Sequence, residues 1–172
     1  MKNLILLILS MLFAQCTSGD DDLLSLTLTP YNGNQLRIDG YYYQIGYDGK
    51  TIFSPYFFYK NGILISPEGM GNSLEEMDSY IKKYYLDCQS YKKDKLDWGV
   101  FIVEGNIIKF GRWYPSERPL KAFIREGVIL NDTTFQITKS YRSDSTEQRG
   151  KDEMYYFRSF SPKPDSTNVY IK

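Results

Sequence analysis

Short runs of aromatic and β-branched residues, separated by tight-turn signals, fill most of this 172-residue chain. The two clearest turn signals are Asn61-Gly62 and Gly105-Asn106. Asn-Gly favours a type I′ turn and a leading Gly favours a type II′ turn, and both types join neighbouring antiparallel strands. The spacing therefore predicts serial antiparallel hairpins with about eight main strands, at residues 36–47, 51–60, 63–66, 98–104, 107–114, 121–130, 133–141 and 154–160.

One stretch has helical spacing instead. Ser73 and Glu76 have the spacing of a capping box. An apolar stripe follows at helical intervals, formed by Leu74, Met77, Ile81, Tyr84, Tyr85 and Cys88. The fold expected is mainly β: an antiparallel meander that closes into a roughly eight-stranded barrel with one helix, since closure removes exposed strand edges. An open antiparallel sheet or sandwich with a packed helix is the alternative.

The hairpin at residues 98–114 has two different faces. Counting outward from its turn, Phe101 meets Phe110 on the first face, which we interpret as core. On the second face Trp98 lies opposite Trp113, and this pair needs a cover. The apolar stripe of the helix is the favoured cover, and a bound ligand is the other.

The next hairpin, at residues 121–141, also alternates. The pattern places Ile124 and Leu130 on the inner face and turns Arg125 toward water. Inward residues of both hairpins are our candidates for a ligand-binding wall: Phe101, Val103, Ile108, Phe110, Phe135, Ile137 and Tyr141.

Composition excludes several kinds of site. The chain has no histidine, which removes Ser-His-Asp and Cys-His catalysis and the common zinc sites. We therefore expect neither enzyme activity, nor a metal, nor a cofactor. The 21 basic and 21 acidic residues balance, so nucleic acid is not an expected partner. Of the two cysteines, Cys88 lies on the helix stripe and is expected to be a small buried apolar residue.

The N-terminal residues have the pattern of a targeting signal. Lys2 precedes an apolar run at residues 4–13, which is too short to span a membrane and has the form of a secretory signal. The sequence Leu12-Phe13-Ala14-Gln15-Cys16 then resembles the lipobox of bacterial lipoproteins, which implies cleavage before Cys16 and lipid attachment to it. The alternative is an ordinary signal peptide with an incidental cysteine.

Three acidic residues, Asp20, Asp21 and Asp22, follow the cysteine closely. This tract resembles the signal that sends lipoproteins of one group of Gram-negative bacteria to the outer face of the outer membrane. The resemblance implies a lipid-anchored protein facing the cell exterior, with the periplasmic face as the alternative. A plain solvated linker would have the same composition. We divide the chain into a signal peptide (1–15), a lipidated cysteine with a flexible acidic tether (16–35) and a single barrel-like domain (36–172).

The strand count and hairpin order also resemble the calycin or lipocalin-like barrels found in many bacterial surface lipoproteins. That resemblance implies a small hydrophobic or amphipathic ligand held inside the barrel. The alternative function is a non-enzymatic interaction or structural module that binds a protein or glycan through exposed aromatic residues.

Overall fold

The computed structural model describes residues 19–115 and 118–172. The signal peptide and Cys16 lie outside the described residues. Nine strands and one α-helix are formed in this part of the chain. The strands are β1 (Gly40–Ile45), β2 (Ile52–Phe58), β3 (Ile63–Ile65), β4 (Met70–Gly71), β5 (Trp98–Glu104), β6 (Ile107–Tyr114), β7 (Lys121–Asn131), β8 (Thr134–Arg142) and β9 (Arg149–Ser159).

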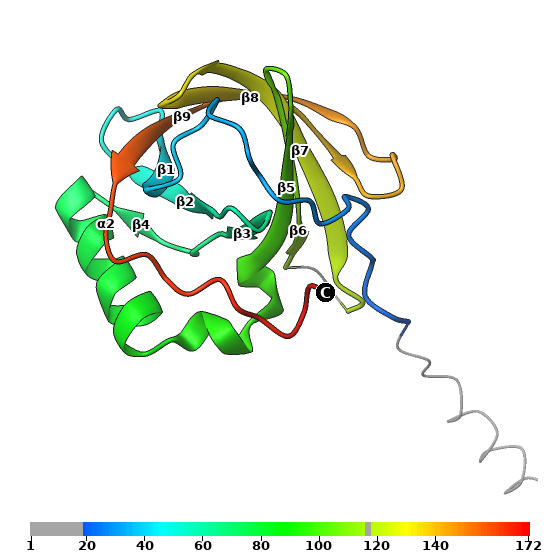
Figure 1. Ribbon diagram of the computed structural model, residues 1–172, viewed down its shortest axis with the longest axis horizontal. Coiled ribbons are helices and arrows are strands. Elements are labelled where there is room, and N and C mark those ends of the chain that lie inside the picture. Colours follow the sequence, from blue (N-terminus) through cyan, green and yellow to red (C-terminus); the bar gives the residue numbers. More distant parts are fainter. Residues whose placement is uncertain (1–18, 116–117) are drawn as a thin grey trace, which may run out of the picture.

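Eight strands close into an antiparallel barrel (Figure 1). Hydrogen bonding follows the order β1-β9-β8-β7-β6-β5-β3-β2, and β2 then pairs with β1 to complete the ring. The short β4 pairs only with β2. The prediction of a meander closing into an eight-stranded barrel with one helix is confirmed, and the open-sheet alternative is wrong.

The helix α2 (Leu74–Ile81) begins where the capping box predicts. The Ser73 hydroxyl accepts a hydrogen bond from the Glu76 backbone N–H, at 3.2 Å. The chain then continues as a π-helical turn (Lys82–Asp87) and two 3₁₀ turns (Ser90–Lys93 and Lys95–Asp97). These turns and α2 lie outside the ring of strands (Figure 1). Cys88 is exposed, so the expectation that it is buried is wrong, because the helical path changes before it is reached.

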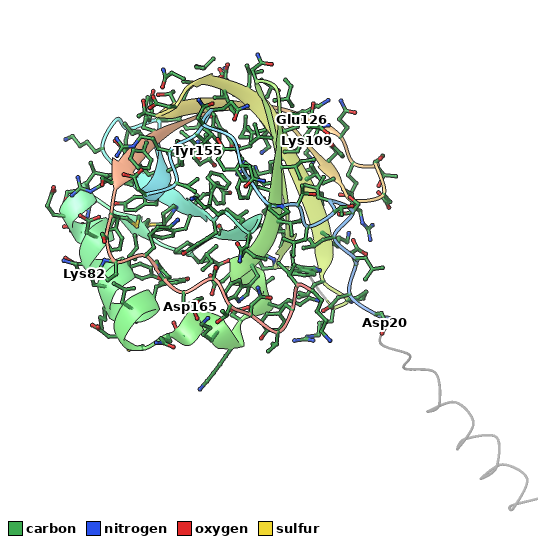
Figure 2. The ribbon with its side chains drawn as sticks, viewed as in Figure 1. Asp20, Lys82, Lys109, Glu126, Tyr155 and Asp165 are labelled. Carbon is green, nitrogen blue, oxygen red and sulfur yellow. The ribbon has the colours of Figure 1, made fainter. Side chains whose placement is uncertain are left out.

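The barrel interior is filled by side chains. Seven aromatic residues from six strands are at most 1% exposed there: Tyr42, Tyr56, Phe58, Phe101, Phe110, Phe135 and Tyr155. Their rings are in contact, with centroids 4.7 Å apart for Phe58 and Phe101 and 4.8 Å apart for Tyr56 and Phe110. Figure 2 shows how densely side chains occupy the space within the ring. The apolar part of this barrel is a packed core.

A second core lies between the outer face of the barrel and the helix. Met77, Ile81 and Tyr85 of the helical region belong to one buried cluster with Trp98 and Trp113. The two tryptophans are 0% and 4% exposed. The direct contacts on the tryptophans come from the 3₁₀ turns and the N-terminal segment: Tyr91 contacts Trp98, and Asp22 and Lys95 contact Trp113. Since both faces of β5 and β6 are buried, neither strand has a simple polar side.

The strand register predicted from the sequence is correct at one hairpin turn and wrong at another. Gly105-Asn106 forms the expected two-residue turn, with Gly105 at φ 61° and Glu104 paired with Ile107. A two-residue turn at Asn61-Gly62 would pair Phe58 with Ile65, but that expected register is wrong by one residue, because Phe58 pairs with Leu64. The loop there has three residues, because Gly62 at φ 81° takes the left-handed position that follows a type I turn.

Strand β7 faces the opposite way from our expectation. Arg125 points into the barrel, where it contacts Tyr56, and Ile129 belongs to the interior cluster. Leu130 is 53% exposed. Ile124 is buried on the outer face, where it lies over Gly111 beside Leu26. The alternation of apolar and polar residues gave the wrong inner face, because the outer face of this strand is covered by another segment and also carries apolar residues.

Strand β8 explains the position of Tyr141. Its register shifts between Ile137 and Lys139, which marks a β-bulge. Phe135 and Ile137 face inward as expected. Beyond the bulge the faces exchange, so Tyr141 lies outside the barrel and bonds to Glu126. The placement of Tyr141 with the inward residues is therefore wrong.

Residues 19–38 are part of the folded unit. Tyr31 and Leu36 are 7% and 3% exposed and belong to the interior cluster at one end of the barrel. Asp20 is exposed. Asp21 instead forms an ion pair with Lys95 at 2.8 Å, and the Asp22 N–H donates to the Leu120 carbonyl at 2.9 Å. The expected free solvation of the acidic tract therefore does not hold for Asp21 and Asp22.

Candidate ligand-binding site

A polar pocket opens at the end of the barrel away from Tyr31. Its volume is about 320 Å³. Ten residues line it: Ser54, Tyr56, Arg112, Tyr114, Phe123, Arg125, Ser140, Glu147, Arg149 and Lys151. Pockets that hold small ligands begin at about 300 Å³. Four of the lining side chains are basic and one is acidic, so the pocket has a basic excess.

Arg125 forms the centre of the polar network. It lies on β7 opposite Phe110, so it extends from the wall directly above the aromatic core. Its Nη1 donates to the hydroxyl oxygens of Tyr56 and Tyr155, each at 3.0 Å. Its Nη2 forms an ion pair with Glu153. Figure 2 labels Tyr155 inside the ring of strands. This arginine is fixed by three partners and paired with a carboxylate.

Arg112 is buried and has no carboxylate partner in the part of the chain that the structure describes. Its Nη1 donates to the Leu96 carbonyl at 3.2 Å, and its guanidinium carbon lies 4.3 Å from the Tyr114 ring centroid. Its strand partner is Gly99. A Cβ at Gly99 would lie only 3.0 Å from the Arg112 Cβ, so the glycine leaves room for this side chain.

Among the described residues, two buried polar atoms in this pocket form no hydrogen bond of normal geometry, although their two side chains interact with each other and this raises the pKa of Arg112. They are Nε of Arg112 and the hydroxyl oxygen of Tyr114. Within the described residues only one other buried side-chain atom, Oγ of Ser143, shares this property. Leaving a buried donor unpaired costs about 1–3 kcal/mol. Such atoms are expected where a ligand supplies the missing partner.

The rim carries further charges. Lys151 lies 3.4 Å from Glu153, and Glu147 faces Arg142 at 3.7 Å. Arg149 is exposed and forms no ion pair with a described carboxylate. The positive charges of Arg112 and Arg149 are therefore not compensated within the described part of the chain.

The two inner arginines remain charged despite their burial. Burial alone would lower the pKa of Arg112, but Tyr114 and Tyr56 raise it overall. Burial alone would lower the pKa of Arg125, but the adjacent Tyr56, Tyr155 and Glu153 raise its pKa overall. Burial raises the pKa of Tyr56 in turn, yet Arg125 and Arg112 outweigh it and lower the Tyr56 pKa overall. The pocket therefore favours negative charge on whatever enters it.

The residues chosen from the sequence lie mostly elsewhere. Phe101, Ile108, Phe110, Phe135 and Ile137 are 0% exposed within the interior cluster, and Val103 packs against that cluster. Phe101 and Val103 also border a larger groove of about 510 Å³ beside residues 25–35. Of the described residues, Glu104 is the only charged one lining that groove, and none of them has a buried unpaired side-chain atom facing it. We therefore place the candidate site at the polar pocket.

Sequence reasoning missed both inner arginines. Period-two alternation assigns charged side chains to the solvent face. Arg125 follows three apolar residues, at positions 122–124, and was assigned to that face for this reason. The one signal was Gly99, a small residue directly after Trp98 in a strand, which marks a close approach of another group.

Comparisons with protein-family models, curated proteins and solved structures found no match to this chain. Among the described residues, no cluster of three or more Cys, Asp or Glu side chains has a geometry suited to a metal ion. No helix in the part of the chain that the structure describes has the length and apolar character needed to cross a membrane.

Proposed function

We propose that this protein binds a small anionic molecule in the polar pocket of its barrel. The observation that carries the proposal is the pair of buried, unpaired atoms, Nε of Arg112 and the hydroxyl of Tyr114, in a pocket with excess positive charge. An anion would accept from both groups and offset the buried charge of Arg112. Charge-assisted hydrogen bonds of this kind are about twice as strong as neutral ones.

A hydrophobic ligand among Phe101 and Phe110 is not favoured by this geometry. Both side chains are 0% exposed and lie in a core whose aromatic rings are in contact. A ligand could enter only by displacing them. Of the hydrophobic and amphipathic ligands expected from the sequence, we therefore favour an amphipathic one whose charged group enters the polar pocket of the barrel.

We also propose binding without catalysis. The chain has no histidine to act as a general base near neutral pH. Binding through exposed aromatic residues has little support, because only Tyr47 and Tyr84 are exposed among the large aromatic side chains of the described residues.

The anchor proposed from the sequence is compatible with this role. We propose that Cys16 carries lipid and holds the barrel at the outer membrane, facing outward. Incorporation of a radiolabelled fatty acid that is lost in Cys16→Ser tests the anchor. Digestion of the protein by protease added to intact cells tests the outward orientation, and a protein that becomes digestible only after the outer membrane is opened would contradict it.

The binding test uses the purified full-length protein and two probes, acetate and inorganic phosphate, at constant ionic strength. Calorimetric titration should show saturable binding of at least one of them. Tyr114→Phe should weaken binding, because it removes the hydroxyl that would donate to the anion. It should also raise the free energy of unfolding by about 1 kcal/mol, because an unpaired buried hydroxyl is lost. Lys60→Gln removes an exposed positive charge outside the pocket and should change neither quantity. No binding of either probe, or equal binding by Tyr114→Phe, would refute the proposal.

A further inference from the structure

The charges of the pocket lie in two tiers. Arg112 forms the inner tier and is 9% exposed. Arg149 is the corresponding outer group: it begins β9 and is exposed at the rim. Phe123 lines the same pocket and contributes apolar surface. A ligand that enters far enough to reach Arg112 also passes the rim that holds Arg149.

The other two basic side chains of the pocket have a carboxylate partner, although they share its single negative charge. Arg125 and Lys151 both pair with Glu153, which is only 14% exposed. Glu147 pairs with Arg142 at 3.7 Å and with Lys121 at 3.8 Å. Within the described residues, the inner tier and the outer tier each retain one positive charge without a carboxylate. One monoanion would offset only one of them.

We propose that the ligand is a small dianion with its two acidic groups separated by a short apolar spacer. This inference rests on the proposed function and adds the class of ligand. The first acidic group binds Nε of Arg112 and the hydroxyl of Tyr114. The second binds the guanidinium of Arg149, and the spacer lies along Phe123. A pocket of about 320 Å³ suits a molecule of the size of a short dicarboxylate.

Two interactions distinguish this ligand from a monoanion. An added ion pair at an exposed arginine raises affinity by up to about fivefold, and a bidentate carboxylate–arginine pair raises it further. We therefore expect a tenfold or greater preference for the best dicarboxylate over acetate. The outer tier should also raise the rate of association, because exposed charges at a rim attract an oppositely charged ligand.

The test is a calorimetric series with the full-length protein: acetate, malonate, succinate, glutarate and adipate at constant ionic strength. 3-Phosphonopropionate is added beside succinate to decide whether the acidic groups are carboxylates or phosphorus oxyanions. One chain length should bind at least tenfold tighter than acetate. Arg149→Gln should reduce that ligand to nearly the affinity of acetate and weaken acetate binding far less, whereas Tyr114→Phe should weaken both to a similar extent.

The outcomes separate the two proposals. If acetate binds and every dianion binds no tighter, the dianion inference is wrong and the proposed function stands. If none of the anions binds to a protein that unfolds cooperatively at the wild-type temperature, the proposed function itself is wrong. If the dianion preference survives in Arg149→Gln, the assignment of the outer tier is wrong.

Discussion

Asp22 and Arg142, 120 residues apart in the chain, form a two-pronged ion pair: Nε and Nη2 each lie 3.0 Å from a carboxylate oxygen. The same carboxylate accepts from the Ala122 N–H at 3.1 Å, and the Asp22 carbonyl accepts from the Trp113 indole at 2.7 Å. These contacts fasten the N-terminal segment to β6, β7 and β8. The acidic tract therefore contributes to the stability of the barrel.

We expect Asp22→Asn to destabilise the fold by about 1–2 kcal/mol, because it loses a charged, partly buried hydrogen-bond acceptor. Asp20→Asn, at an exposed neighbouring position, should change stability by less than about 0.5 kcal/mol. Urea unfolding of both variants measures the difference. Equal stabilities would show that Asp22 is not fastened to the barrel.

This pair also has a defined pH dependence. The hydrogen bond from Arg142 lowers the pKa of Asp22 below 3.8. The stabilisation is therefore present above about pH 4 and is lost as the pH falls through the lowered folded-state pKa. The stability difference between wild type and Asp22→Asn should shrink below pH 4.

Asp97 has the opposite pH dependence. Burial raises its pKa to about 7, although a hydrogen bond from the Tyr85 hydroxyl at 2.7 Å opposes the increase. The folded state binds a proton that the unfolded state has lost between about pH 4 and 7, so Asp97 makes the protein less stable as the pH rises through that window.

The stability of wild type relative to Asp97→Asn should thus fall by up to about 1.4 kcal/mol per pH unit between pH 4.5 and 6.5. Denaturant unfolding at several pH values measures this slope. Asp87→Asn, an exposed control, should give a curve parallel to wild type. A pH-independent difference for Asp97→Asn would contradict the burial argument.

The packed interior predicts a large cost for Phe110→Ala. Removing this 0% exposed ring should cost about 3–5 kcal/mol, because neighbouring rings cannot fill the cavity. Leu130→Ala should cost less than about 0.5 kcal/mol, since Leu130 is 53% exposed on the outer face. Thermal unfolding compares the two. A small effect at Phe110 would indicate a hollow barrel.

Gly99 should be intolerant of a methyl group. A Cβ there would lie 2.4 Å from the Gly111 carbonyl oxygen as well as close to Arg112, so Gly99→Ala must move backbone and should cost about 1–3 kcal/mol. Gly150→Ala, with open space around the added carbon, is the matched control. If both variants were equally stable, the close approach of Arg112 to β5 would be disproved.

Local signals explain which features could be predicted from the sequence. The turn at Gly105-Asn106 and the helix start at Ser73 depend on a few adjacent residues, and both were predicted correctly. The number and order of the strands followed from such signals. Closure through the pairing of β1 with β9 has no such local signal and was predicted only from the cost of exposed strand edges, because it depends on the twist summed over the whole sheet.

The site was missed for a different reason. Inward and outward faces can be read from alternation only when one face meets water, and here Leu26 and the helix cover part of the outer face. The β-bulge before Lys139 contains no Gly or other turn residue from which it could be predicted. Arg125 was therefore assigned to solvent, although it lies inside the barrel.

The central claim is that an anion binds Nε of Arg112 inside the polar pocket. Nuclear magnetic resonance of the arginine Nε–Hε groups during an acetate titration tests it most directly, with Lys60→Gln as an unaffected reference and Tyr114→Phe as the weakened variant. We predict a saturable downfield shift of the Arg112 Hε signal as it gains a hydrogen-bond acceptor. An Arg112 signal that does not move at saturating acetate, in a folded protein, would contradict the account.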